Sequence, residues 1–512
     1  MKTNKLTSII AVCLILFQTS CQDFLDVDPV GKLIPTKVVE LENLLNNSNT
    51  YDYLFLDNNR GCFYALLGDN ITFDTGLSET LYYATHPNIN RYHAYIFALP
   101  YSNPVSAQYF WTYNYRAISY FNNVIAGIDN LSAAEKNSDH AKEVIAEAKA
   151  GRAWQYLQQV LVYGPPYNPA GANDQKVIPY RTAESPLAPN PPLHTVAEIY
   201  DFLLQDLTAA LDAPEMVGNP TRAGKTAVLA LHAQYYMFKR DWQNMLKYAD
   251  EAWNLALNLE GSVDNLIYNF NDFEYSKTTV TVAEGIDSAY YWNLRHKGGD
   301  LNFRQAYNRE SLLYRVSPVT GQNHYVSDDF LSLFDTKNDL RFKLFILNYN
   351  GWGNDGIRKF NYRGSKLIYN EGLSYPDLLL MRAEAYARNG QPASALADLN
   401  LLRKYRYDNA SSTDLTNGAS LNADQLLVEI LKERRLEQPF ESFLRTVDIK
   451  RYTLDTGKPW SKTTITHTIG DKTYSAPVND QYFNVPIDNG IITLNPDWGL
   501  SPDNTSYVAK PE

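Results

Sequence analysis

The stretch Ser374–Ala387 reads SYPDLLLMRAEAYA, and a second stretch of similar pattern, Ala395–Arg403, reads ALADLNLLR after the turn residues Asn389-Gly390-Gln391-Pro392. Apolar residues recur every three or four positions on both sides of that turn, which is the spacing of one helix face. Ala383 is small enough to let two helices approach closely, and Tyr386 can fill the groove between them. The stretch therefore predicts two antiparallel helices joined by a short turn.

The same order of small residue, tyrosine and turn occurs a second time, upstream. Ala233 and Tyr236 precede a turn at Asp241-Trp242, and Ala249 and Ala252 follow it. Any antiparallel helix pair could produce this pattern once, but two pairs with the same order resemble the tetratricopeptide repeat. We therefore expect a scaffold of repeated helical pairs.

Further helices are marked by their ends. Ala146–Gly164 has helical periodicity and stops abruptly at Gly164-Pro165-Pro166. Another helix is expected to start at Thr195, whose hydroxyl can cap the helix while Glu198 reaches back as a capping box. These patterns predict a mostly α fold whose helical-pair scaffold lies mainly in residues 110–260 and 374–452.

Two stretches, 68–113 and 264–370, are aromatic and poor in helix signals. The second contains short extended runs such as Thr278–Val282 and Ser288–Leu294, separated by Gly, Asn and Asp. Loops on a rigid scaffold are where binding usually resides, so we expect ligand to meet these two stretches. From Thr453 onward the chain is expected to be irregular, with turn residues throughout.

Composition adds a hint about the ligand and excludes one class of partner. The chain has 38 Tyr against 21 Phe, with 8 Trp, and Tyr and Trp offer an apolar face with a polar group. Such rings suit the flat faces of sugars, although each could instead pack between helices. The 57 acidic against 46 basic residues argue against nucleic acid.

The N-terminus resembles an export signal followed by the cleavage site of a bacterial lipoprotein. Lys2 and Lys5 precede the apolar run Ile9–Phe17, which is far shorter than the roughly 20 residues needed to span a bilayer. Residues 1–20 therefore read as a signal peptide, and Cys21 as the lipidated first residue of a bacterial lipoprotein. The alternative is an ordinary secretory signal that leaves Cys21 as a free thiol. With a lipid on Cys21, residues 21–45 would form a tether and an N-terminal segment.

No motif for catalysis, a cofactor or a metal ion occurs. Phosphate-binding glycine loops, nucleotide fingerprints and zinc-ligand spacings are all missing from the sequence. Glu433, Glu437 and Glu441 recur at intervals of four, which stacks them along one helix face. Three basic residues beside them can form surface or interhelix ion pairs with these carboxylates: Lys432, Arg434 and Arg435. We therefore expect a binding protein without cofactor rather than an enzyme.

A set of short segments follows one order from Cys21 almost to the C-terminus. They are Cys21 with Asp23–Asp26, Gly61–Asn70, Glu147–Gly164, Thr195–Leu211, Val326–Asp328, Asp339–Arg341, Ser374–Ala387, Ala395–Arg403, Ile430–Glu437, Asp448–Arg451, Val485–Ile487 and Leu494–Pro496. The ordered set resembles the SusD/RagB-type outer-membrane lipoproteins. Gln438-Pro439 and Ser442 depart from the family pattern at a join between two helices.

The resemblance implies both a fold and a function. Residues 21–512 would form a single ectodomain in which tetratricopeptide-like pairs support ligand-binding loops. The protein would be anchored in the outer membrane, face outward, capture an oligosaccharide and pass it to a SusC-like TonB-dependent transporter. Three alternatives stay open: capture of peptides, as in RagB-like uptake; a pure protein-interaction scaffold; and a surface glycoside hydrolase.

Candidate ligand contacts are chosen where rings stand beside hydrogen-bonding groups in the two loop-rich stretches. Rings would stack on sugar faces, while Asn and Arg would bond hydroxyl pairs. Trp352 is favoured because glycines flank it in a loop, where a core role explains it less easily. The candidates are Tyr82, Tyr83, Asn90, Arg91, Tyr92, Tyr290, Trp292, Asn293, Arg295 and Trp352.

Overall fold

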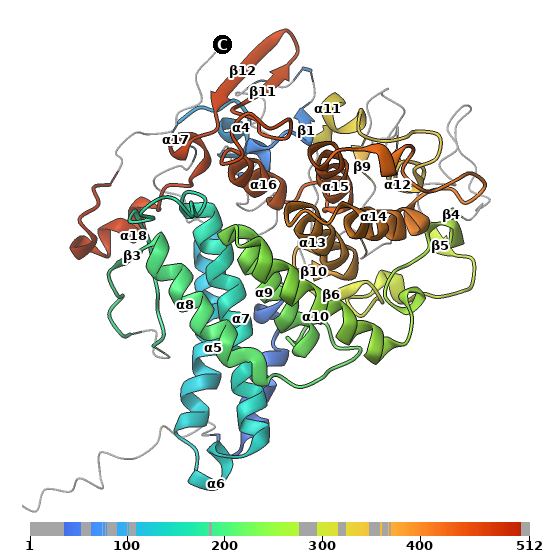
Figure 1. The fold of residues 1–512 in the computed structure, drawn as a ribbon. Coiled ribbons are helices and arrows are strands. Elements are labelled where there is room, and N and C mark those ends of the chain that lie inside the picture. The colour runs from blue at the N-terminus through green and yellow to red at the C-terminus, as the bar shows by residue number, and fades with distance from the viewer. Residues whose placement is uncertain are drawn as a thin grey trace, which may run out of the picture.

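The protein folds mainly into helices joined by loops and short strands (Figure 1). The computed structural model describes residues 35–52, 63–73, 75–76, 78, 90–99, 101, 109–183, 187–275, 294–315, 324–347, 359–360, 367 and 370–502. Within these residues the expected mostly α scaffold is confirmed. Its longer helices are α5 (Tyr109–Asp129), α7 (Asp139–Tyr163), α8 (Val196–Ala209), α9 (Lys225–Lys239), α10 (Trp242–Glu260), α13 (Tyr375–Arg388), α14 (Pro392–Arg406), α15 (Ala423–Glu437) and α16 (Leu444–Tyr452).

Shorter helices lie between and around these. They are α2 (Val38–Glu42), α4 (Asn90–Tyr95), α6 (Ala133–Lys136), α11 (Asp328–Leu331), α12 (Leu340–Phe345), α17 (Asp480–Phe483) and α18 (Asn489–Thr493). In the described part of the chain, no helix has both the length and the apolar character that crossing a membrane requires.

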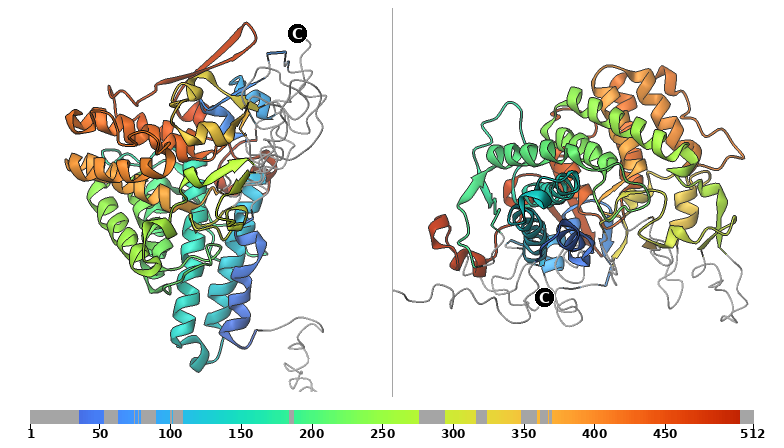
Figure 2. Two further views of the ribbon diagram at one scale, coloured as in Figure 1. Left: turned by 90° about the vertical axis from the view of Figure 1, so that its right-hand side faces the viewer. Right: turned by 90° about the horizontal axis from the view of Figure 1, so that it is seen from below.

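The two predicted hairpins are α9–α10 and α13–α14, and they pack side by side through α10 and α13. The small residues Ala249, Ala383 and Ala395 are completely buried at the helix contacts, which allows the close approach. The Tyr386 hydroxyl donates to the Asp250 carboxylate at 3.4 Å and so joins the second hairpin to the first. Figure 2 shows these hairpins on one side of the molecule, with α2 and α5 on the other.

Local signals explain where the helices begin and end. Thr195 and Glu198 form the predicted reciprocal capping box at the start of α8, and α7 ends at Tyr163 before Gly164. A Cβ on Gly151 of α7 would come within 2.4 Å of the Phe121 ring on α5. Glycine at this position therefore sets the close packing of α5 against α7.

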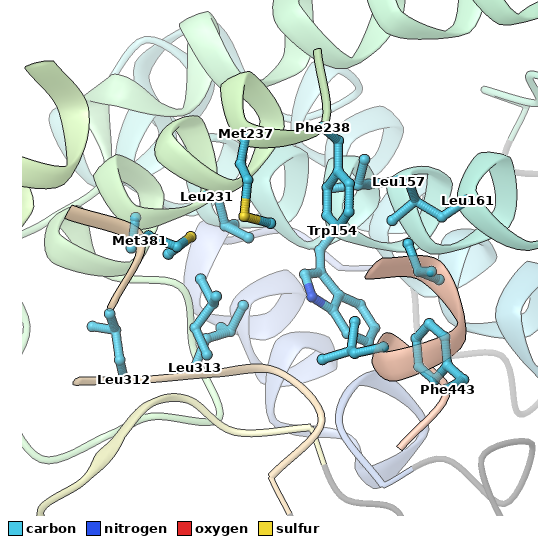
Figure 3. Packing of buried hydrophobic residues seen from close by; sticks show 14 of the residues in the cluster. Trp154, Leu157, Leu161, Leu231, Met237, Phe238, Leu312, Leu313, Met381 and Phe443 are labelled. Carbon is cyan, nitrogen blue, oxygen red and sulfur yellow. The ribbon is translucent and has the colours of Figure 1, made fainter. Parts of the chain in front are cut away.

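One hydrophobic core joins the helical pairs (Figure 3). Trp154 of α7 is 1% exposed and lies at its centre, between Phe238 of α9 and Phe443. Met381 of α13 and Leu313 approach the core from the other side. Residues from segments far apart in sequence thus share one core, which fixes the positions of the loops between them.

The strands form short antiparallel pairs. They are β1 (Ile71–Phe73) with β7 (His324–Val326), β2 (Lys176–Pro179) with β3 (Leu193–Thr195), β4 (Phe273–Tyr275) with β5 (Leu294–His296), β6 (Ser311–Leu313) with β10 (Leu373–Ser374), β8 (Ile346–Leu347) with β9 (Lys359–Phe360), and β11 (Thr464–Ile469) with β12 (Lys472–Pro477). The expected run Thr278–Val282 lies outside the described residues. Of the run Ser288–Leu294, only Leu294 lies within them, and it begins β5.

The expectation of an irregular chain after Thr453 is wrong for residues 464–477. There β11 and β12 form a regular hairpin with strict alternation of exposed and buried residues along β11. His467 is buried and stacks between Tyr95 at 4.3 Å and Phe97 at 4.7 Å. The alternation of Thr with Ile and His was readable as a half-buried strand, but the many turn residues nearby obscured it.

Buried ion pairs bind the C-terminal helices together, and their partners differ from those expected. Glu433 and Glu437 accept from Arg341 at 2.7 and 2.6 Å instead of pairing with the basic residues beside them. Arg434 pairs with Asp448 at 2.9 Å and Arg435 with Asp69 at 3.0 Å. The sequence neighbours of Glu433 and Glu437 lie on other faces of α15, so helices and loops distant in sequence supply the partners.

Gln438 and Ser442, which depart from the family pattern, form buried hydrogen bonds at the join between α15 and α16. The Gln438 amide donates to Asp448 at 2.8 Å, and the Ser442 hydroxyl donates to Glu371 at 2.6 Å. Both side chains are buried. The polar residues at this join are therefore accommodated by acidic partners inside the fold.

Candidate functional site

A cleft of about 310 Å³ opens where the first helical hairpin meets the loop-rich stretch. One wall consists of the loop Met216–Pro220, the start of α9 and the last residue of α10, Glu260. The other wall consists of the segment 300–312, which leads into β6. One wall of the cleft thus belongs to the stretch 264–370, where the sequence predicts ligand contacts, and the other wall comes from the helical scaffold, which the sequence did not select.

Turns and strand pairing hold the two walls. α10 ends at Glu260 and is followed by Gly261, whose φ of +83° is a left-handed conformation that favours glycine, and Gly218 in the loop of the same wall has a φ of +72°. The β6–β10 pair ties the segment 300–312 to the start of α13, where Tyr375 also lines the cleft. The walls are therefore anchored on the helical scaffold.

Within the lining, Tyr268, Asp300 and Arg309 form one bonded group, which we call the floor of the cleft. Asp300 accepts hydrogen bonds from the Tyr268 hydroxyl at 3.0 Å, from Arg309 at 2.9 Å and from the backbone amide of Asn302 at 2.8 Å. The Arg309 guanidinium lies over the Tyr268 ring, 4.2 Å from its centre. Each of the three side chains is fixed by the other two, so the floor is ordered before any ligand arrives.

Electrostatics agree with this geometry. Burial alone would raise the pKa of Asp300, but the Asn302 amide, Arg309 and Tyr268 stabilise the carboxylate and hold its pKa below the usual value. Burial, followed by the nearby Asp300 carboxylate, raises the pKa of the Tyr268 hydroxyl above its usual value. Asp300 therefore stays ionised and Tyr268 stays protonated at neutral pH.

Buried charges connect the floor to the scaffold. The Tyr268 backbone amide donates to Glu310 at 2.8 Å, and its carbonyl accepts from Arg406 of α14 at 2.9 Å. Arg406 also binds Glu310 and Glu437 of α15, both at 2.9 Å. The position of Tyr268 is thus determined by helices more than a hundred residues away.

The rim of the cleft carries exposed apolar side chains and polar amides. Val217 and Tyr307, which line the cleft, are 53% and 56% exposed, and Leu301, between the lining residues Asp300 and Asn302, is 63% exposed. Exposed amides lie beside them at Asn265 and Asn302. An open phenol ring beside amide and charged groups suits a ligand that combines apolar faces with many hydroxyls.

Most of the site residues predicted from the sequence lie outside the described residues: Cys21, Tyr82, Tyr83, Tyr290, Trp292, Asn293 and Trp352. Asn90 begins α4, but its side chain is not among those described. Their predicted roles are therefore neither supported nor contradicted by the geometry, and they stay predictions.

Three predicted residues can be placed. Arg91 and Tyr92 on α4 are 1% and 3% exposed, and Tyr92 lies nearly parallel to Phe73 at 6.3 Å. Neither side chain is open to a ligand in this conformation. Arg295 is exposed on β5, where it pairs with Glu274 at 2.9 Å. Next to it on β5, the His296 ring lies 6.1 Å from the Tyr268 ring, but successive strand residues point to opposite faces, and Arg295 is not among the residues that line the cleft.

The sequence reasoning missed the residues that form the cleft. Tyr307-Asn308-Arg309 has a ring beside an amide and a guanidinium, which is the signal that selected the segment Asn90–Tyr92. That signal could have found Tyr307 and Arg309. Tyr268, Asp300 and Glu260 carry no such signal, because their proximity arises only when the helical hairpin packs against the loops.

The described residues contain no group of three or more His, Cys, Asp or Glu side chains that could hold a metal ion. Glu433, one of the stacked glutamates, is buried and accepts from both Arg341 and the Tyr407 hydroxyl. Its pKa, which burial would raise, is held below the usual value by Arg341 and other donors. Glu433 therefore belongs to the structural ion-pair network.

Comparison with known sequences covers nearly the whole chain. The family model described as the SusD family matches residues 274–497, and the model described as "Starch-binding associating with outer membrane" matches residues 23–237. A SusD-like protein of Bacteroides ovatus is 23% identical over 134 residues, which are 26% of this chain. The match spans only 23% of that relative's length.

Solved structures of similar fold cover both chains almost completely. A SusD superfamily protein from Bacteroides fragilis has a TM-score of 0.63 at 20% identity, with 91% of this chain and 99% of that chain aligned. A putative sugar binding protein from Bacteroides vulgatus has a TM-score of 0.62 at 18% identity, with 91% and 98% aligned. A SusD-like carbohydrate binding protein from the same species has a TM-score of 0.59 at 18% identity, with 90% and 97% aligned. These structures show that the fold is shared, and the two family models, which together cover most of the chain, show that this chain belongs to the SusD/RagB family.

Proposed function

We propose that this protein is a cell-surface lipoprotein that captures oligosaccharides and delivers them to a SusC-like TonB-dependent transporter in the outer membrane. Three observations support the proposal. The chain belongs to the SusD/RagB family, two proteins of similar fold are named as sugar or carbohydrate binding, and one matching family is described as starch-binding and associated with the outer membrane. Cys21 after a short apolar run supplies the expected anchor.

The observation that carries the proposal is the exposed Tyr307 ring beside the ordered floor of Tyr268, Asp300 and Arg309. A sugar ring has an apolar face, which stacks on an aromatic ring, and an edge of hydroxyls, which bonds to carboxylate, guanidinium and amide groups. An ordered floor lowers the entropy cost of binding, since its side chains are already fixed. The cleft therefore suits capture of a carbohydrate.

Capture by this cleft requires no covalent step. Asp300 already accepts from three donors, so it is suited to orient hydroxyls and not to transfer a proton. Several weak contacts on an open rim allow a ligand to leave quickly, which delivery to a transporter demands. A lipid on Cys21 and the acidic tether Gln22–Pro29 would keep the captured ligand near the membrane.

Calorimetry of the purified protein against oligosaccharide and peptide panels tests the proposal. We expect binding to at least one oligosaccharide, and we expect Tyr307→Ala to weaken it at least 10-fold, about 1.4 kcal/mol, without loss of thermal stability. Tyr474→Ala is the matched control, because this half-buried tyrosine on β12 does not line the cleft. Binding of peptides without binding of any glycan would favour RagB-like peptide capture instead.

The same measurement tests the loop residues predicted from the sequence. If Trp292 and Trp352 stack on sugar as proposed, their replacement by Ala weakens binding while the fold is retained. Unchanged affinity in both variants would reject them as stacking residues. Turnover of any glycan would contradict the proposed role as a binding protein, and loss of turnover in a single carboxylate variant would identify a hydrolase.

A further inference from the structure

We infer that the cleft selects neutral oligosaccharides and discriminates against acidic ones such as those built from uronic acids. The inference rests on the proposed function and goes beyond it by naming the class of sugar. It follows from the charged groups that line the cleft and from how each of them is neutralised. These groups are Arg222, Arg309, Glu260 and Asp300.

Both arginines of the cleft are already committed to carboxylates of the protein. Arg222 is buried and bonds to Glu147 at 2.5 and 2.7 Å and to Glu42 at 3.1 Å. Arg309 bonds to Asp300 at 2.9 Å, donates to the Asp264 carbonyl at 2.8 Å and stacks on Tyr268. A ligand carboxylate would have to displace one of these partners to reach a guanidinium.

Glu260 is the carboxylate of the cleft that lacks a cationic partner among the described residues. It lies at the C-terminal end of α10, where the helix carbonyls add negative potential. Tyr375, which also lines the cleft, has its pKa raised by burial and then by the nearby Glu260, which places the Glu260 carboxylate on the cleft side of the helix. Burial also raises the pKa of Glu260 itself, as expected for an acid without a nearby cation.

The charge that a ligand meets without a partner is therefore negative. Of the four charged lining residues, Arg222 and Arg309 are paired with carboxylates of the protein, and Glu260 is left without a cation. Like charges at close range repel, and screening by salt weakens but does not remove the effect within one Debye length. The exposed side chains of Val217, Leu301 and Tyr307 carry no charge, so they can contact a neutral sugar ring and do not offset the repulsion of an acidic one.

The direct test compares each neutral oligosaccharide that binds with its C6-oxidised form, in which a primary alcohol has become a carboxylate. The two ligands share size and linkage, so the affinity ratio reports on charge. Calorimetry of the purified full-length protein should give at least 10-fold weaker binding for the oxidised form. Equal or tighter binding of the oxidised form would overturn the inference and leave the proposed function intact. No binding of any oligosaccharide would overturn the proposed function itself.

Two variants assign the selectivity to the cleft. Glu260→Gln should reduce the ratio of neutral to oxidised affinity at least 3-fold, whereas Glu251→Gln, an exposed change on the same helix outside the cleft, should leave it unchanged. Val217→Lys adds a cation to the exposed rim and should improve binding of the oxidised form. If neither cleft variant changes the ratio, the inference is wrong about the cleft.

Discussion

The helical hairpins and the cleft use the same residue types for opposite purposes. In the second hairpin, Glu384 and Arg388 of α13 lie beside Arg451 of α16, and the buried Glu384–Arg451 pair joins these two helices. In the cleft, Asp300 and Arg309 are partly open to solvent and, together with the buried Tyr268, fix a surface. The difference teaches that charge in this protein is structural where it is buried and available to a ligand only where it reaches the rim.

The largest expected effect concerns the scaffold. Glu384 is fully buried and accepts from Arg451 at 2.8 and 2.9 Å and from Arg388 at 2.8 Å. Glu384→Gln removes the buried carboxylate that Arg451 and Arg388 share and leaves them only Asp448 and Asp455, so we expect unfolding in denaturant to show a loss of ~3 kcal/mol. Asp424→Asn breaks the exposed pair with Lys458 and should cost less than ~1 kcal/mol. Similar losses in both variants would contradict the distinction between buried and exposed pairs.

A second prediction concerns pH. Burial raises the pKa of Glu371 to about 8, while the Ser442 hydroxyl opposes the shift and Asp377 and Glu441 add to it. Because the folded pKa lies above the unfolded value near 4.5, the contribution to stability is present below pH 4.5 and is lost as pH rises through about 8. Glu371→Gln should remove that loss.

The expected gain of Glu371→Gln over the natural chain is at most ~5 kcal/mol at pH 9, with little difference at pH 4. Thermal unfolding followed by circular dichroism across this pH range measures it. The acidic control is Asp328→Asn, an exposed change at the start of α11. Parallel pH profiles for the natural chain and Glu371→Gln would show that Glu371 is ionised in the fold.

The third prediction is a large loss of ligand affinity with little loss of stability, whereas the first is a large loss of stability. Asp300→Ala removes the acceptor shared by Tyr268, Arg309 and the Asn302 amide, so the floor loses its order. We expect oligosaccharide affinity to fall at least 10-fold, about 1.4 kcal/mol, while stability falls by only ~1 kcal/mol because the site is partly exposed. Asp329→Asn, an exposed change distant from the cleft lining, should leave affinity unchanged. Retained affinity in Asp300→Ala would separate the floor from ligand binding.

The smallest effect on the folded protein is expected at Cys21. Cys21→Ala removes the proposed lipid without changing the described scaffold or cleft, so binding in solution and thermal stability should match the natural chain. The variant should be released from the membrane fraction, which immunoblotting of fractionated cells measures. Loss of binding in solution by Cys21→Ala would show that the anchor segment contributes to the site.

Sequence patterns predicted the scaffold because its signals are local. The capping pair Thr195 and Glu198 lies within one helix turn, and the turn Asn389–Pro392 joins two helices adjacent in sequence. The cleft could not be predicted in the same way. Glu260, Asp300 and Tyr375 come from three distant segments, and only the packed hydrophobic core brings them together.

The predicted ion-pair partners of Glu433 and Glu437 were wrong for the same physical reason. A helix position faces residues three or four away on its own helix, but Glu433 and Glu437 are buried and face Arg341, about a hundred residues upstream. The hairpin of β11 and β12 is a different kind of failure, since its alternation was visible in the sequence. The many turn residues around it predict an irregular chain, whereas the alternation with a period of two predicts the strand that the structure contains.

A crystal structure of the protein with a bound oligosaccharide tests the central claim most directly. We predict a sugar ring stacked on Tyr307 with hydroxyls bonded to Asp300 or Arg309. An oligosaccharide bound elsewhere at full occupancy, with none in this cleft, would contradict the assignment of the cleft as the capture site.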